Sequence, residues 1–232
     1  MTVYAGTSGY SYKEWKGSFY PEKLPAAEML RYYATQLPAV EINNTFYRMP
    51  RANVIESWAD QVPGDFRFVV KAPRRITHLK RLRNSREEAE YLFDTVAGLG
   101  ERLGIILFQL PPNLKKDLER LEDFLDDLPK SLRGAFEFRH DSWEDDEIYD
   151  LLRSRNMALC TADKEGDETR ELVSTANFGY LRLRRPDYGD SDLSSWLERI
   201  TTQKWEETYV FFKHEDAGAG PRMAKAFLER FA

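Results

Sequence analysis

Cysteine and histidine are scarce in this chain of 232 residues. It has one cysteine, Cys160, so an intrachain disulfide is excluded. Cys160 ends an apolar run, where a free cysteine is usually a small buried residue rather than a nucleophile. The three histidines are His78, His140 and His214. So few residues of these two types leave little material for a zinc site, which draws on several such ligands.

Long apolar runs are also missing. No stretch approaches the roughly 20 apolar residues that span a bilayer. A strand-like run follows directly on Met1 and leaves no room for a signal peptide. We therefore expect a cytoplasmic protein with no membrane segment. The net charge of -5 argues against a chain coated in positive charge for nonspecific nucleic-acid binding.

What the chain does have is a regular alternation of strand-like runs and helical patterns. The expected strands are 3–6, 40–43, 66–71, 104–110, 135–139, 157–161, 179–184 and 208–213, and the expected helices are 26–36, 53–61, 85–99, 115–128, one that begins near Asp141 or Ser142, 193–200 and 223–231. The apolar run 104–110 is typical of a strand buried on both faces of a parallel sheet. Ser85 and Glu88 have the spacing of a capping box.

This order predicts a (β/α)8 barrel that forms one domain over residues 1–232. The segment 164–175 is polar and shows no helical period, so we expect the sixth helix to be irregular or missing.

Polar residues end most of the expected strands, and in such barrels the active site lies at the carboxyl ends of the strands. In the segment 136–143, Phe-Glu-Phe-Arg-His-Asp-Ser-Trp, Glu137 and Arg139 share one face. We expect them to point into the mouth of the barrel. The complete set expected there is Glu41, Asn43, Lys71, Gln109, Glu137, Arg139, Arg182, Arg184 and Lys213, with Thr7, Ser8 and Asp163 at neighbouring strand ends.

These charges have two interpretations. They can form structural ion pairs, such as Glu137 with Arg182, because charged side chains are rarely buried unless paired. They can also line a ligand pocket, which we favour because apolar residues would fill a purely structural barrel at a lower desolvation cost. The cations outnumber the acids, and arginine suits phosphate or carboxylate. The prediction is therefore a small anionic ligand.

We predict neither a metal nor a cofactor. The possible metal ligands Glu41, Glu137, Asp163, His140 and His214 are interleaved with cations that would oppose a metal ion.

Three residues are candidates for catalysis. Glu41 and Glu137 can act in acid–base chemistry, since enclosure raises a carboxylate pKa and a nearby arginine lowers it. Each can equally orient an arginine. His140 can carry a proton or can bond to backbone near a helix start.

Two further features concern binding. The aromatic residues of the expected strand-end loops can stack on a ligand or fill the loops themselves; they are Tyr10, Tyr12, Trp15, Phe46, Tyr47, Trp143 and Tyr188. The segment 74–83 is basic, from Arg74 to Arg83, and is either a phosphate-contact patch or a solvated loop. A nucleic-acid-binding protein and a non-catalytic binding scaffold therefore stay open as alternatives.

Several long motifs, in order and covering most of the chain, resemble the YecE-like family, the domain of unknown function 72. They are 6–15 (GTSGYSYKEW), 19–21 (FYP), 40–50 (VEINNTFYRMP), 71–73 (KAP), 76–78 (ITH), 107–112 (LFQLPP) and 137–140 (EFRH). The resemblance implies a (β/α)8 barrel and no established activity. The family's distant likeness in fold to sugar isomerases and endonuclease IV suggests sugar or DNA roles by analogy only.

Two strand ends depart from the family's pattern. Where the family usually has Arg-Leu-His-Gly, this chain has Arg182-Leu183-Arg184-Arg185. Where it usually has Phe-Asn-Asn, this chain has Phe212-Lys213-His214. Two strand ends that are neutral in the family are therefore cationic in this chain. We expect this member to prefer a more anionic ligand, such as a sugar phosphate or nucleotide. The ligand would be bound or acted on without a metal.

Overall fold

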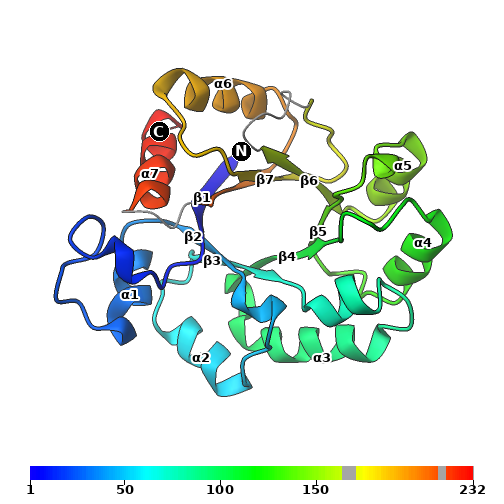
Figure 1. Cartoon of the computed structure of the whole chain (residues 1–232), viewed down its shortest axis with the longest axis horizontal. Coiled ribbons are helices and arrows are strands. Elements are labelled where there is room, and N and C mark those ends of the chain that lie inside the picture. Colours follow the sequence, from blue (N-terminus) through cyan, green and yellow to red (C-terminus); the bar gives the residue numbers. More distant parts are fainter. Residues whose placement is uncertain (164–170, 214–217, 232) are drawn as a thin grey trace.

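The computed structural model describes residues 1–163, 171–213 and 218–231 of the chain. Eight parallel strands close into a barrel in the order of the sequence, and helices surround it (Figure 1). The strands are β1 (Thr2–Ser8), β2 (Ala39–Ile42), β3 (Arg67–Lys71), β4 (Leu103–Gln109), β5 (Gly134–Glu137), β6 (Ala158–Asp163), β7 (Phe178–Leu183) and β8 (Glu207–Phe212). The predicted (β/α)8 fold is confirmed.

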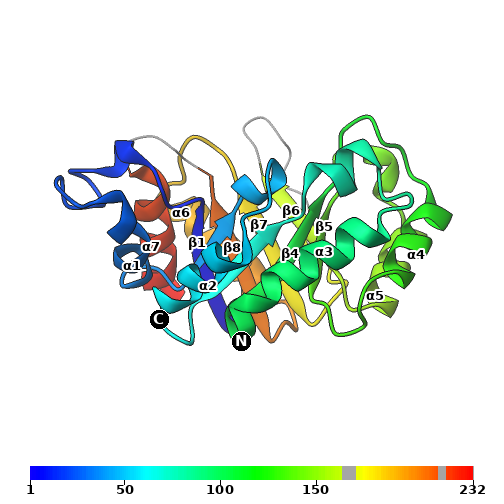
Figure 2. The same cartoon turned by 90° about the horizontal axis from the view of Figure 1, so that it is seen from below.

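The α-helices lie outside the strands in both views (Figures 1 and 2). They are α1 (Met29–Ala34), α2 (Ala52–Asp60), α3 (Arg86–Val96), α4 (Leu118–Asp126), α5 (Asp146–Ser154), α6 (Asp190–Thr201) and α7 (Ala219–Phe231). Short helical turns join them, namely η1 (Lys13–Trp15), η2 (Ala26–Glu28), η3 (Asn44–Phe46), η4 (Arg75–Leu79), η5 (Ala97–Arg102) and η6 (Asp141–Trp143). None of the helices in the described ranges is long and apolar enough to cross a membrane.

The expectation for the sixth helix concerns the connection between β6 and β7. Residues 171–177, the described part of this connection, contain no helix. Residues 164–170 lie outside the described ranges. In Figure 1 no labelled helix stands between α5 and α6.

Apolar residues alternate between two cores. Val69 and Leu107 belong to the cluster inside the barrel, whereas Val70 and Phe108 belong to the larger cluster between strands and helices. Alternate side chains of a strand point to opposite faces, so this alternation assigns a direction to every strand position. Residues 41, 109, 137 and 182 fall on the inner face.

The amino-terminal end of the barrel is filled by aromatic rings and one ion pair. Tyr4 of β1 stacks on Tyr209 of β8 with ring centroids 5.0 Å apart. Nearby, Nη2 of Arg133 lies 2.6 Å from Oε2 of Glu207. The described residues therefore pack the interior at this end of the barrel.

The predicted cap of α5 is wrong, and the predicted cap of α3, Ser85, stands at the N-cap position without the capping box. Asp145 caps α5, since its Oδ1 accepts from the Glu147 N–H at 3.0 Å, and residues 141–143 form the separate turn η6. Ser85 and Glu88 form no capping box: the Ser85 hydroxyl donates to the Leu82 carbonyl. Glu88 instead accepts from charged side chains, which form stronger hydrogen bonds than a backbone N–H does.

Candidate functional site

Arg182 of β7 bridges two carboxylates from strands that are not its neighbours, β2 and β5. Its Nη2 donates to Oε1 of Glu41 at 2.7 Å, and its Nη1 donates to Oε2 of Glu137 at 2.6 Å. The exposed fraction is 2% for Arg182, 0% for Glu41 and 1% for Glu137. Burial alone would lower the pKa of Arg182, but the two carboxylates raise it, so this guanidinium stays charged.

Glu41 is enclosed by donors. Oε1 also accepts from the Ser8 hydroxyl at 2.7 Å and from Asn43 Nδ2 at 2.8 Å, and Oε2 accepts from the Tyr180 hydroxyl at 2.6 Å. Burial alone would raise the pKa of Glu41. The charge of Arg182 and the hydrogen bonds from Tyr180, Ser8 and Asn43 hold that pKa below its usual value. Glu41 is therefore a buried carboxylate whose described partners are all donors.

Glu137 fixes the orientation of Gln109, and Gln109 in turn meets Lys71. The carboxylate can only accept, so the Gln109 amide turns its Nε2 toward Glu137 Oε2, at 2.8 Å. That leaves the amide oxygen on the other side, where it accepts from Lys71 Nζ at 2.8 Å. Arg184 completes the group, with Nη2 3.2 Å from both carboxylate oxygens of Glu137.

Lys71 is a buried amine with no carboxylate directly beside it. Its side chain is 9% exposed, and Nζ lies 4.2 Å from the centre of the Phe46 ring. In the described ranges, Lys71 makes no salt bridge within 4.0 Å. Burial, aided by the charges of Arg182 and Lys213, lowers the pKa of Lys71 to about 8.

Further cations stand at the rim. Arg139 and Lys213 are exposed, and neither has a carboxylate within 4.0 Å in the part of the chain that the structure describes. Arg139 lies just beyond β5, which ends at Glu137 rather than at the predicted residue 139. Partial burial and then the charges of Lys71, Arg139 and Arg81 lower the pKa of His78, so its imidazole is predominantly neutral at neutral pH.

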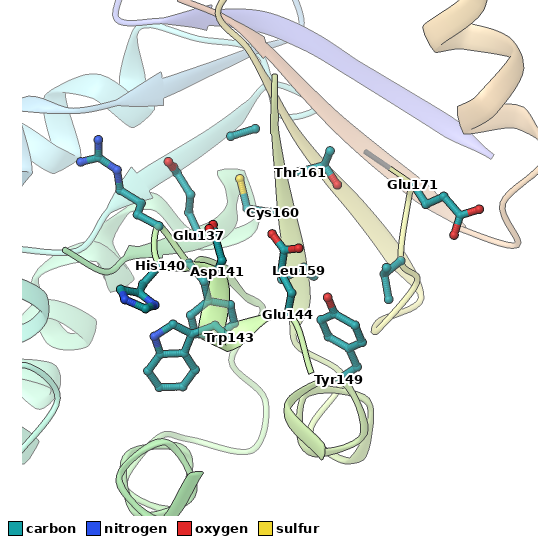
Figure 3. Close-up of a pocket in the computed structure, with 14 residues that line it drawn as sticks. Glu137, His140, Asp141, Trp143, Glu144, Tyr149, Leu159, Cys160, Thr161 and Glu171 are labelled. Carbon is teal, nitrogen blue, oxygen red and sulfur yellow. The ribbon is translucent and has the colours of Figure 1, made fainter. Parts of the chain in front are cut away.

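A pocket of about 410 Å³ opens next to this polar group, between the ends of β5 and β6 and helix α5 (Figure 3). Beside it, β5 and β6 pair at only two positions, Ala135 with Ala158 and Phe136 with Leu159, and from Cys160 onward β6 pairs with β7. Its lining is Glu137, Phe138, Arg139, His140, Asp141, Trp143, Glu144, Tyr149, Leu159, Cys160, Thr161, Ala162, Glu171 and Val173. Glu137 belongs both to the pocket and to the hydrogen-bonded set of Glu41, Lys71, Gln109, Glu137, Arg182 and Arg184, which we call the charge group.

Two predicted residues in this pocket have structural partners. The Nδ1 of His140 accepts from the Ser142 N–H at 3.1 Å, so a neutral imidazole here carries its proton on Nε2. Trp143 is buried, stacks on Phe138 at 4.6 Å and donates from Nε1 to the Leu114 carbonyl at 2.7 Å. Burial and the charge of Glu137 raise the pKa of the Cys160 thiol well above its usual value, which makes it a poor nucleophile.

Four other predicted positions lie outside the charge group. The Thr7 hydroxyl bonds to Tyr33 of α1, and Asp163 accepts from the Tyr188 hydroxyl at 2.8 Å and from Arg185, so both face the helix layer. Thr7 and Asp163 each stand an odd number of positions from the inward-facing residues of their strand, so their side chains point to the outer face. The Trp15 side chain is fully buried among loop aromatics, whereas Tyr47 is 76% exposed.

Three of the five lysines and arginines in the basic segment 74–83 contact carboxylates of the chain. Arg75 and Lys80 both bind Glu88, at 2.7 Å each, and Arg83 lies 3.5 Å from Asp117. Glu88 has its pKa lowered to about 2, chiefly by the hydrogen bonds from Lys80 and Arg75. These pairs favour the structural interpretation of the segment over a phosphate-contact patch.

Sequence reasoning missed Tyr180 and His78 as contributors to the mouth, and it named Phe46 only as one of the aromatic residues of the strand-end loops. Tyr180 could have been found by the strand period, since it stands two residues before Arg182. His78 and Phe46 are edge-to-face neighbours at 4.9 Å, from the connections after β3 and β2. Neither lies on a strand, so no period assigns them a direction.

A metal would need several ligands in one place. Within residues 1–163, 171–213 and 218–231, no cluster of three or more histidine, cysteine, aspartate or glutamate residues could hold a metal ion. His214, one of the predicted ligands, lies outside these ranges.

Comparisons with known proteins agree with the resemblance seen in the motifs. The model of the family "Protein of unknown function DUF72" matches residues 4–232. The UPF0759 protein YecE of Escherichia coli (strain K12) is 30% identical over 258 residues, which cover 98% of this chain and 92% of that protein. The UPF0759 protein YunF of Bacillus subtilis (strain 168) is 25% identical over 271 residues, covering 98% and 94%.

A solved structure shares the whole architecture. The crystal structure of a DUF72 family protein from Thermotoga maritima MSB8 superposes with a TM-score of 0.88 at 29% identity. The alignment covers 100% of this chain and 99% of that one.

Proposed function

The chain belongs to the DUF72 family, and from the arrangement of charges in its barrel we propose that the mouth binds a small anionic ligand. One observation carries the proposal. Glu41 and Glu137 are already bound by Arg182 and Arg184, and the remaining cations of the mouth, Lys71, Arg139 and Lys213, have no carboxylate partner in the described ranges. Such cations are available to a phosphate or a carboxylate.

The pocket beside β5 and β6 narrows the ligand class. Arg139 at its rim suits a phosphate, whereas Asp141, Glu144 and Glu171 line its other walls and would repel one. Carboxylates accept hydrogen bonds from hydroxyl groups. We therefore assign the pocket to the hydroxylated part of a sugar phosphate or nucleotide, with its phosphate at the cationic rim.

Acid–base chemistry on this ligand would fall to Glu137 and His140. Both line the pocket. Oε1 of Glu137, whose one hydrogen-bond partner in the described ranges is Arg184 at 3.2 Å, offers an acceptor, and a neutral His140 offers Nε2–H. Glu41 does not line the pocket, and its oxygens are occupied by Arg182, Tyr180, Ser8 and Asn43. We propose that Glu41 orients Arg182 and does not transfer protons.

Isothermal titration with inorganic phosphate, sugar phosphates, nucleotides and the matching unphosphorylated compounds tests the proposal. We expect saturable binding of phosphorylated compounds that weakens with salt, because exposed charges are screened. Binding of the unphosphorylated compounds alone, or of none, would overturn it. A short oligonucleotide in the same titration tests the nucleic-acid alternative, which the paired segment 74–83 does not favour.

A further inference from the structure

We propose that Lys71 is a nucleophilic amine that condenses with a carbonyl group, so that the ligand class is an aldehyde or ketone carrying a phosphate or carboxylate. The inference rests on the proposed anion site and adds the identity of the reacting group. A lysine becomes a nucleophile when it is desolvated or placed near other cations. The environment of Lys71 meets both conditions.

The first argument is the immediate partner of the amine. Nζ donates to a neutral amide oxygen, Oε1 of Gln109, at 2.8 Å. A neutral acceptor can be bonded equally by an ammonium or an amine, whereas a carboxylate would hold the ammonium form. Gln109 is kept in this orientation by Glu137, whose carboxylate accepts from Nε2 of the same amide.

The second argument is the balance of charge around Lys71. Arg182 from β7 and Lys213 after β8 disfavour the ammonium, whereas Glu41 from β2 and Glu137 from β5 favour it. Both carboxylates already accept hydrogen bonds from Arg182, Glu137 at 2.6 Å and Glu41 at 2.7 Å. The face of Phe46 also favours the cation, but burial outweighs it, and the pKa falls to about 8.

The third argument is position. Residue 71 ends β3 on the inner face, at the open end of the barrel, and the side chain keeps 9% exposure. Lys71 is not among the residues that line the pocket beside β5 and β6, so on this proposal the carbonyl group of the ligand extends from the pocket across the mouth to Nζ. Lys116 offers a contrast in the connection after β4, where Asp145 and Glu147 lie 2.8 Å and 2.6 Å from its Nζ and raise its pKa.

The chemical step is a condensation. The neutral Nζ attacks the carbonyl carbon and a C–N bond forms. The carbonyl oxygen then leaves as water with two protons supplied in net terms by the amine, and a C=N bond remains. We assign the movement of these protons to Oε1 of Glu137 and the Nε2–H of His140, two of the titratable groups that line the pocket. No oxidant or reductant is needed.

Borohydride trapping tests the inference. The full-length protein is incubated with glyoxylate, pyruvate, glycolaldehyde phosphate or dihydroxyacetone phosphate, and with dihydroxyacetone as the carbonyl compound without an anion. Borohydride then reduces any C=N bond, and intact mass followed by peptide mapping locates the adduct. We expect one adduct, on Lys71, with at least one anionic carbonyl compound and much less with dihydroxyacetone.

Controls keep the outcome decisive. Lys71→Arg should abolish the adduct because a guanidinium is not deprotonated under these conditions, and Lys116→Arg should leave it unchanged. In the unmodified chain, a general amine reagent should label Lys71 far faster than Lys116 near pH 8. Roughly half of a group with pKa 8 is neutral there, against roughly 0.3% of an ordinary lysine, so the expected ratio is on the order of a hundredfold.

Two results would overturn the proposal: adducts spread over surface lysines at similar rates, or trapping that persists in Lys71→Arg. If the protein binds phosphate but borohydride traps no adduct, the condensation is refuted and the anion site is still supported. If dihydroxyacetone gives as much adduct on Lys71 as the anionic carbonyl compounds do, the anion site is refuted instead.

Discussion

The Nη2 atom of Arg182, at the end of β7, lies 2.7 Å from Oε1 of Glu41, in β2. The two residues are 141 positions apart in the sequence and have almost no exposed surface. The same guanidinium holds Glu137 from β5. Three strands that are not neighbours are thereby joined across the inside of the barrel, just beneath the mouth.

Removing the cation from this group should destabilise the fold strongly. We expect Arg182→Met to lower the free energy of unfolding by about 3–5 kcal/mol, because it leaves the buried Glu41 without a counter-charge and Glu137 with Arg184 alone. Urea denaturation measures the change. Arg86→Met is the matched control, since Arg86 pairs with Glu90 at the surface and an exposed pair contributes less than about 1 kcal/mol. Equal losses in the two variants would contradict the central role of Arg182.

The lowered pKa of Lys71 predicts a pH dependence of stability. The pKa is about 8 in the folded chain and near 10.5 in the unfolded chain, so between these values the unfolded state binds more protons. Stability contributed at this site therefore rises with pH over that interval, by at most about 3 kcal/mol. Lys71→Met should remove the rise. The measurement is the difference in unfolding free energy between the two proteins from about pH 7 to pH 9.5, and a constant difference would refute the shift.

The rim cations should affect ligand binding without affecting the fold. Arg139→Ala and Lys213→Ala should each weaken the binding of a phosphorylated ligand about tenfold, since a hydrogen bond to a charged group contributes about 1.5–3 kcal/mol. Their unfolding free energies should change by no more than about 0.5 kcal/mol, as for other surface substitutions. Arg74→Ala, an exposed arginine of the basic segment, is the control and should bind normally. The prediction fails if all three variants bind alike.

Glu88 should restrain two cations of the basic segment, Arg75 and Lys80. In Glu88→Gln, Arg75 and Lys80 lose their shared carboxylate, so we expect a loss of about 1 kcal/mol and a gain in salt-sensitive binding of oligonucleotides. Because the pKa of Glu88 is lowered to about 2, its contribution to stability is present above about pH 4.5 and is lost as the pH falls toward 2. Fluorescence anisotropy with a labelled oligonucleotide is the measurement. Strong binding by the unmodified chain would support the nucleic-acid alternative.

The tertiary structure decided which polar side chains meet. The period of two is a local property of a strand, and it correctly placed Glu41, Gln109, Glu137 and Arg182 inside. Thr7 and Asp163 were expected only to lie at strand ends, and the structure turns their side chains toward the helix layer. Partners in the helix layer, the Tyr33 and Tyr188 hydroxyls, satisfy these two residues.

The sequence by itself determined the barrel, because alternating strand and helix periods admit few other closed arrangements, and it determined that charge would collect at the strand ends. Only the tertiary structure decided how that charge is divided. It matched Arg182 and Arg184 to buried carboxylates and left Lys71 facing a neutral amide. The physical reason is that Coulombic pairing and desolvation depend on distances across the barrel, which the closure of β8 onto β1 sets and no local pattern encodes.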